Sequence, residues 1–231
     1  MKPICTAVIV AAGKGKRMGT DISKQFLPLC GKEILTHTVE VFEKADRIRD
    51  IVLVTGTDSL QDVQDMVREY GWQKVISVVA GGKERQDSVW NGLQAISEDT
   101  EIVLIHDGVR PFVTEEILDL SIETAVEMGG CAAGVPAKDT IKVCNSENIA
   151  VDTPDRSTLW QIQTPQTFRK ELIVKAYEQA KAEGFLGTDD ASLAENSGYS
   201  VKVIMGSYRN IKITTKEDLL IGEAFLKEGQ V

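Results

Sequence analysis

Glycine and cationic residues are concentrated directly after the first apolar run of the chain. The segment 11–19 reads Ala-Ala-Gly-Lys-Gly-Lys-Arg-Met-Gly, and Lys24 follows shortly afterwards. Glycines at the end of a buried strand let backbone N–H groups approach a phosphate closely. Arg17 and Lys24 add positive charge where phosphate oxygens would lie. The segment is neither a Walker P-loop nor a regular G-x-G-x-x-G fingerprint, so we predict a phosphate-binding loop of another type.

A second glycine-rich segment, Gly81–Val89, lies between an apolar run and a predicted helix. Paired glycines leave room for a nucleotide base or ribose to approach the backbone. Ser88 has two interpretations, because a serine at a helix start either caps the helix or contacts a ligand. The segment alone is typical of a helix start, so a binding role for Gly82 and Ser88 depends on what else lies near them.

Asp107 follows the apolar run Ile102–Ile105. A carboxylate at the C-terminal end of a central strand is well placed to bind a metal ion or a ribose hydroxyl. Arg110 can either pair with Asp107 or reach a phosphate. We interpret His106 as a buried, hydrogen-bonded histidine rather than as a catalyst.

Lys212 stands between two isoleucines in Ile211–Thr214, a run predicted as a strand. Strand alternation turns its side chain away from the core, which fits both simple exposure and a ligand-binding role. Farther upstream, Thr188 or Asp189 is predicted to cap a helix.

The elements that would position these residues alternate along the chain. Runs that are apolar on both faces favour a mostly parallel sheet covered by amphipathic helices. The fold class is therefore α/β, a doubly wound sheet whose ligand lies beyond the carboxyl ends of its strands. The predicted strands are Ala7–Val10, Ile51–Thr55, Val75–Val79, Ile102–Ile105 and Cys131–Val135. The predicted helices are Ile34–Lys44, Leu60–Tyr70, Ser88–Ile96 and Glu115–Met128.

The stretch 138–160 interrupts this alternation. Two short β-like runs around the polar turn 145–148 predict a hairpin. A hairpin with few large apolar residues has little core of its own, so it is expected to pack on something else, such as a second subunit. We predict one domain over 1–231, with this arm used in dimerisation. Its remaining elements are expected at Leu159–Gln163, Arg169–Ala182, Asp190–Ser197, Val201–Met205 and Lys216–Lys227.

The composition excludes several classes of function. With 231 residues, 42% hydrophobic and 26% charged, the chain is typical of soluble globular proteins, and no apolar run approaches the roughly 20 residues that span a bilayer. A net charge of −9 argues against nucleic-acid binding. The N-terminus lacks a signal-peptide pattern, and four cysteines without metal-site spacing predict free thiols. We therefore expect a cytoplasmic protein with no nucleic-acid or membrane partner.

The ordered set of motifs resembles the 2-C-methyl-D-erythritol 4-phosphate cytidylyltransferase family of the non-mevalonate isoprenoid pathway. The glycine loop alone is shared by many nucleotidyltransferases, whereas the whole set is specific and runs over essentially the entire chain. One departure is Gly108-Val109, where two alanines are common in the family. The motifs here are 11–19, Lys24-Gln25, 82–89, 106–111, 138–140, 156–160, 163–166, 188–192 and 210–214.

The resemblance implies a Rossmann-like nucleotidyltransferase fold, a homodimer with active sites shared through the hairpin, and a magnesium ion near Asp107 that is bound mainly by phosphates. Cytidine and ribose would be surrounded by Ala11, Ala12, Gly13, Gly15, Gly82, Ser88 and Asp107. Arg17 and Lys24 would contact the triphosphate and stabilise the transition state. Arg156 and Lys212 would position the methylerythritol phosphate, in a pocket also lined by Thr140, Arg110 and Thr164.

The implied reaction is attack of a substrate phosphate oxygen on the α-phosphorus of CTP, with pyrophosphate as the leaving group. The nucleophile is already an anion, so the reaction needs alignment and charge neutralisation rather than a catalytic triad. The nearest alternative is a D-ribitol 5-phosphate cytidylyltransferase. A non-catalytic nucleotide sensor is less consistent with the retained Arg17, Lys24 and Lys212. A nicotinamide oxidoreductase is less consistent with the irregular glycine pattern.

Overall fold

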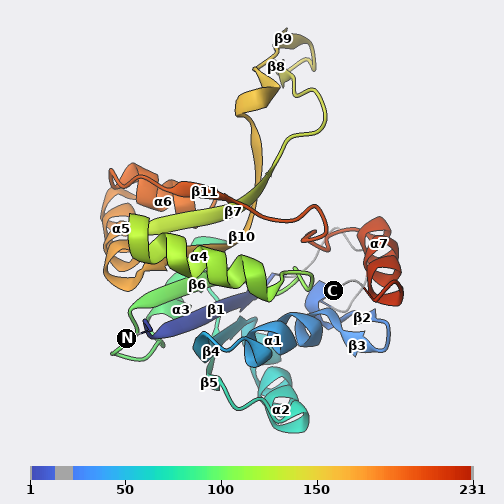
Figure 1. Ribbon diagram of the computed structural model, residues 1–231, viewed down its shortest axis with the longest axis vertical. Helices are drawn as coiled ribbons and strands as arrows, with labels where there is room; N and C mark the ends of the chain where they lie inside the picture. The colour runs from blue at the N-terminus through green and yellow to red at the C-terminus, as the bar shows by residue number, and fades with distance from the viewer. Residues whose placement is uncertain (1, 14–22, 230–231) are drawn as a thin grey trace.

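A seven-stranded sheet forms the centre of the computed structural model, which describes residues 2–13 and 23–229 (Figure 1). The strand order is β11-β7-β10-β6-β1-β4-β5. All neighbours are parallel except β10, which runs antiparallel to both β6 and β7. The strands are β1 Cys5–Ala11, β4 Ile48–Thr55, β5 Val75–Ala80, β6 Ile102–Asp107, β7 Gly130–Pro136, β10 Trp160–Arg169 and β11 Lys202–Met205. The predicted doubly wound, mostly parallel α/β fold is confirmed.

Helices cover both faces of this sheet, because its strands carry buried apolar side chains on each side. One face packs against α1, α2 and α4, and the other against α3, α5 and α6. A smaller core joins α7 to the two-stranded β2–β3 ribbon. The bounds are β2 Pro28–Leu29, β3 Lys32–Glu33, α1 Ile34–Lys44, α2 Leu60–Tyr70, α3 Arg85–Leu93, α4 Glu115–Met128, α5 Lys170–Glu183, α6 Asp190–Asn196 and α7 Lys216–Lys227. Within the described ranges, none of these helices has the length and apolar character to cross a membrane.

The segment between β7 and β10 leaves the body of the protein as a long arm (Figure 1). It contains the short antiparallel pair β8 Val143–Cys144 and β9 Ala150–Asp152, followed by the 3-10 turn η4 Arg156–Thr158. Nearly every residue of the arm is exposed, including the large apolar side chains of Ile149 and Val151. The predicted hairpin is therefore present, and it has no core of its own in a single chain.

Four helices, α1, α2, α4 and α7, have the predicted bounds, but two local predictions are wrong. Helix α3 begins at Arg85 rather than at Ser88, because Glu84 and Asp87 form a reciprocal capping box at its start. The run Ile211–Thr214 is not a strand. Its backbone is tied to Val109 through Ile213, whose N–H donates to the Val109 carbonyl at 2.9 Å. The run is apolar because Ile213 is buried in the small core under α7 and Ile211 packs against that core.

Candidate functional site

A cavity of about 200 Å³ opens at the carboxyl ends of β1 and β6. This is the edge at which parallel α/β sheets bind ligands. The cavity collects residues from five separate segments of the chain, so its chemistry depends on the whole fold. Its lining residues are Val10, Ala11, Ala12, Gly13, Lys24, Gln25, Gly82, Lys83, Glu84, Arg85, Ser88, Asp107, Val109 and Lys212.

The wall formed by the second glycine segment tolerates no side chain at its first two positions. A Cβ on Gly81 would lie 2.4 Å from the Cβ of Ala12, and a Cβ on Gly82 would lie 2.2 Å from the Cβ of Asp87. Both contacts are shorter than side chains allow. Gly81 therefore lets this loop pack directly against Ala12 at the end of β1, and Gly82 lets the loop turn tightly beside Asp87.

Ser88 holds this loop in place rather than capping α3. Its hydroxyl donates to the carbonyl of Glu84 at 3.0 Å and accepts from the N–H of Gly82 at 3.0 Å. The capping interpretation of Ser88 is therefore wrong, since the N-cap is Glu84. The predicted cap at Asp189 is confirmed by its bond from the Ser192 N–H at 2.9 Å.

Asp107 is the electrostatic centre of the cavity. Lys212 Nζ lies 2.8 Å from its Oδ2, Arg85 Nε 3.3 Å from its Oδ1, and Arg110 Nε 3.6 Å from its Oδ2. Burial acts to raise the pKa of Asp107, but the charges of the three cations outweigh it and hold that pKa well below its usual range. The carboxylate is thus ionised at neutral pH. Arg85 also pairs with Asp190, so these three cations and two carboxylates together carry a net charge of +1, which suits a phosphorylated ligand.

Arg85 joins the cavity to a second buried carboxylate. Its guanidinium contacts Asp190 at the start of α6 through two bonds of 3.0 and 2.7 Å, and the hydroxyl of Tyr177 donates to the same carboxylate at 2.5 Å. Burial lowers the pKa of Arg85, but Asp190 and Asp107 together raise it above its usual value. The bidentate pairing fixes the plane of the guanidinium and leaves its Nε facing Asp107.

His106 is fully buried behind Asp107 and fits the predicted structural role. Its Nε2 donates to the carbonyl of Arg110 at 3.1 Å, so Nδ1 carries no proton and accepts from the hydroxyl of Thr164 at 3.1 Å. The same hydroxyl oxygen accepts from the Asp107 N–H at 3.1 Å. Burial lowers the pKa of His106 to about 4, so the ring is neutral and orients Thr164.

Lys212 reaches the cavity because the chain is anchored on both sides of it, at Asn210 and at Ile213. Asn210 is completely buried and donates to the carbonyl of Thr164 at 2.8 Å. Its own carbonyl accepts from Arg110 Nη1 at 2.8 Å, and Ile213 is buried on the other side. Lys212 is thus aimed at Asp107 instead of at solvent, which excludes simple exposure.

The predicted site residues fall into three groups. The cavity brings together Ala11, Ala12, Gly13, Lys24, Gly82, Ser88, Asp107 and Lys212, and Arg110 and Thr164 adjoin it through contacts with Asp107. Thr140 and Arg156 lie on the exposed arm, where Arg156 Nη1 donates to the Lys138 carbonyl at 2.9 Å. Gly15 and Arg17 lie outside the described residues. A single chain therefore does not bring the two arm residues to the cavity.

Residues Gln25, Lys83, Glu84 and Arg85 also line the cavity, although sequence reasoning assigned them no role there. All four stand in motifs that the sequence singled out, two beside predicted site residues. Arg85 could not be assigned from the sequence, because its main partner Asp190 is 105 positions away. One sequence signal for Gln25 was available, because it is a polar residue directly before the apolar pair Phe26-Leu27.

The donor set restricts how a divalent cation fits this site. Carboxylate oxygen is the ligand type that Mg²⁺ prefers, and Asp107 supplies it, but its Oδ2 already receives Lys212. Across residues 2–13 and 23–229 no group of three or more His, Cys, Asp or Glu side chains could hold a metal ion. The residues fit an ion that takes most of its ligands from phosphate oxygens and one from Asp107.

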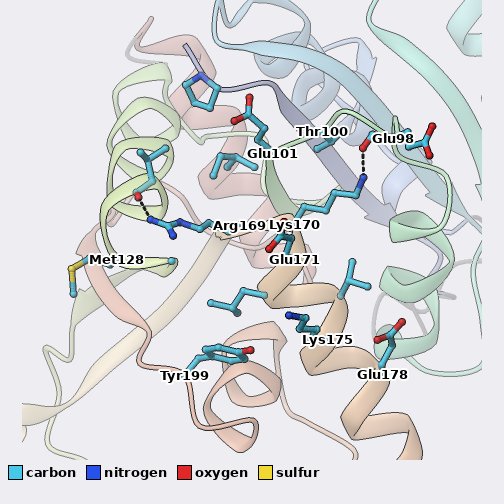
Figure 2. A pocket seen from close by; sticks show the side chains of 16 residues that line it. Glu98, Thr100, Glu101, Met128, Arg169, Lys170, Glu171, Lys175, Glu178 and Tyr199 are labelled. Atoms are coloured by element: carbon cyan, nitrogen blue, oxygen red, sulfur yellow. Dashed lines mark hydrogen bonds between the residues drawn. The ribbon is translucent and has the colours of Figure 1, made fainter. Parts of the chain in front are cut away.

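A larger hollow of about 1100 Å³ lies at the opposite edge of the sheet, near the start of β6 and the N-terminus of α5. Figure 2 shows that it mixes cations such as Arg169 and Lys175 with Glu98, Glu101 and Glu178. The Lys170 ammonium is held by the backbone of this hollow, since its Nζ donates to the Glu98 carbonyl at 2.6 Å. None of the predicted site residues lines this hollow, so the smaller cavity is the candidate site.

Comparison with known proteins gives one consistent family. The sequence profile of "IspD: 2-C-methyl-D-erythritol 4-phosphate cytidylyltransferase" matches residues 5–228. The enzyme of that name from Geotalea uraniireducens is 55% identical over 225 residues, or 96% of each chain. The one from Alkaliphilus oremlandii is 50% identical over 223 residues, which cover 96% of this chain and 94% of its own. The crystal structure of 4-diphosphocytidyl-2C-methyl-D-erythritol synthase from Anaerococcus prevotii superposes with a TM-score of 0.87 at 34% identity, covering 98% and 97% of the two chains.

Proposed function

The chain belongs to the 2-C-methyl-D-erythritol 4-phosphate cytidylyltransferase family, and we propose that the cavity around Asp107 is where it carries out the family reaction. It is a nucleotidyltransferase that transfers CMP from CTP to 2-C-methyl-D-erythritol 4-phosphate and releases pyrophosphate in isoprenoid precursor synthesis. The observation that carries the assignment of the site is the convergence of Lys24, Asp107 and Lys212 with the two glycine segments on one cavity.

The nucleotide end of the site is proposed to lie in the part of the cavity lined by Ala12, Gly13 and Gly82. Gly81 lets its loop pack against Ala12, and the Ser88 hydroxyl holds Gly82 in place through its N–H. Backbone N–H and carbonyl groups next to glycines are open to approach, and they can bond the edge of a base.

Charge neutralisation is proposed to come from Lys24, together with Arg17. As the acceptor phosphate attacks, negative charge builds on the oxygens around the α-phosphorus and on the leaving pyrophosphate. A fixed ammonium beside these oxygens stabilises that charge at no cost of solvent reorganisation. A bound Mg²⁺ would supply further charge neutralisation next to Asp107.

The acceptor is proposed to lie on the Lys212 side of Asp107, near Arg110 and Thr164. Arg156 and Thr140 complete this part only if a second chain delivers them, because the arm points away from its own body. Its exposed Ile149 and Val151 are the kind of apolar surface that a second subunit covers. We therefore propose a homodimer with shared sites.

The cytoplasm remains the proposed location of the enzyme. All four cysteines lie in the described part of the chain, and all four are free thiols, which is the usual state in a reducing compartment.

The deciding experiment measures pyrophosphate release from CTP and Mg²⁺ with each of two acceptors in parallel. Turnover with 2-C-methyl-D-erythritol 4-phosphate and not with D-ribitol 5-phosphate is the expected result. The ribitol alternative has no support from the comparisons. Turnover with ribitol phosphate alone would keep the nucleotide site and overturn the assignment of the acceptor.

A further inference from the structure

Gln25 is a polar side chain held in an apolar setting. It belongs to the 3-10 turn η2, Lys24–Phe26, and only 2% of it is exposed. The turn is closed by backbone bonds from Phe26 to Ser23 and from Leu27 to Lys24. Phe26 and Leu27 pack into the two cores on either side. The position of Gln25 is therefore set by its neighbours, not by its own carboxamide.

That carboxamide lacks a partner for its oxygen. Oε1 of Gln25 is buried, and no donor among residues 2–13 and 23–229 bonds to it. A buried amide oxygen without a hydrogen bond destabilises the folded state, and such groups in native proteins call for an explanation. Gln25 also lines the cavity beside Lys24. The terminal torsion of glutamine is broad, so rotation about it changes which atom of the carboxamide faces the cavity.

The chemistry of the missing donor is restricted. An amide oxygen needs an O–H or N–H group, and ionised phosphate has neither. The cations around the cavity are the partners for phosphate. The 4-amino group of cytosine also donates, but the base is proposed to lie beside Gly82. The substrate donors expected beside Lys24 are therefore the hydroxyls of the ribose and of the polyol phosphate.

We propose that Gln25 is a substrate-binding residue whose carboxamide oxygen accepts a hydrogen bond from a substrate hydroxyl. The inference rests on the proposed function and adds a contact that selects hydroxylated substrates. The hydroxyl belongs either to the ribose of CTP or to the acceptor.

The test compares the full-length wild-type enzyme with Gln25→Met, which keeps the length of the side chain and removes its polar end. Loss of one neutral hydrogen bond lowers kcat/KM by about 3- to 10-fold. If the donor is a ribose hydroxyl, this loss disappears with either 2′-deoxy-CTP or 3′-deoxy-CTP. If the donor belongs to the acceptor, both analogues retain the loss and KM for the polyol phosphate rises.

Two results would overturn the proposal. One is an unchanged kcat/KM for both substrates. The other is a loss confined to CTP that both deoxy analogues retain. Wild-type turnover in the same assay tests the proposed function separately. The proposed function and the role of Gln25 can therefore be rejected independently of each other.

Thr55→Val is the matched control. Thr55 Oγ1 is also buried without a partner among the described residues, yet Thr55 does not line the cavity. Both substitutions should leave the unfolding temperature of the free protein unchanged or higher, and only Gln25→Met should change the kinetics. A lower unfolding temperature for Gln25→Met would show a partner inside the protein and would also overturn the proposal.

Discussion

Lys212 Nζ lies 2.8 Å from Asp107 Oδ2 at the mouth of the cavity. The pair joins the end of β6 to a segment with no regular secondary structure, and its geometry depends on the buried anchors Asn210 and Ile213. The Asp107 carboxylate also faces Arg85 and Arg110. Because Arg85 is shared with Asp190, these three cations and two carboxylates together carry a net charge of +1. This net positive charge favours the binding of a negatively charged, phosphorylated substrate.

Lys24→Ala is expected to lower kcat by about 10²- to 10³-fold, because removing one donor to a transition-state oxyanion typically has that effect. Steady-state pyrophosphate release measures it. Lys44→Ala, at an exposed position on α1, is the control and should turn over normally. Near-normal turnover of the Lys24 variant would remove this lysine from the mechanism.

Shared active sites predict complementation between two inactive variants. Arg156→Ala removes the arm residue, and Lys24→Ala removes the residue of the body. When the two chains are mixed in equal amounts and exchange freely, half of the dimers are mixed and each contains one intact site. We expect recovery of about one quarter of wild-type activity in a symmetric dimer.

Sedimentation of each variant alone, before mixing, controls for changes in assembly. If each chain builds its site from its own arm, mixing will restore nothing, and that result would contradict the shared-site arrangement.

His106 makes stability depend on pH. Its pKa is about 4 in the folded protein, whereas the usual histidine pKa of 6.5 applies in the unfolded chain. Between these two pH values the unfolded chain therefore binds more protons than the folded protein. The free energy of unfolding contributed by this group is complete above pH 6.5 and falls as the pH drops toward 4, by up to about 3 kcal/mol.

Urea denaturation at several pH values tests this prediction against His106→Gln. The stability difference between the two proteins should shrink as the pH is lowered from about 7.5 to about 4.5. Parallel pH curves would show that the ring does not titrate as its burial predicts.

Arg85→Ala should destabilise the fold by about 3–5 kcal/mol, because it leaves Asp190 as a buried charge without its cation. Asp190 has no exposed surface, and its remaining side-chain partner is the hydroxyl of Tyr177. Arg68→Ala breaks the exposed pair with Asp65 and should cost about 0–1 kcal/mol. Equal effects in urea denaturation would mean that the buried pair is no stronger than a surface pair.

Much of the fold could be predicted from the sequence because its signals are local. Helices α1, α2, α4 and α7 were predicted with their observed bounds, since apolar periodicity and the first turn of a helix involve neighbouring residues. The position of the glycine segments after strands likewise predicted the edge of the sheet at which the cavity lies. Local signals failed where a short segment offers more than one capping residue. Ser88 was predicted as a possible cap of α3, but the cap is Glu84.

The partners within the site were decided only by the tertiary structure. Sequence placed Asp107, Arg110 and Lys212 in ligand-binding motifs, but it could not show that Arg85 bridges Asp107 and Asp190. Nor could it show that Ile211–Thr214 is a loop whose lysine is aimed inward by a buried asparagine and isoleucine. Ion pairs and burial depend on distances in space, and residues separated by 105 positions leave no periodic signal of their contact. The sequence by itself determined the fold class and predicted which residues carry the chemistry, and the packing of the fold decided how those residues meet.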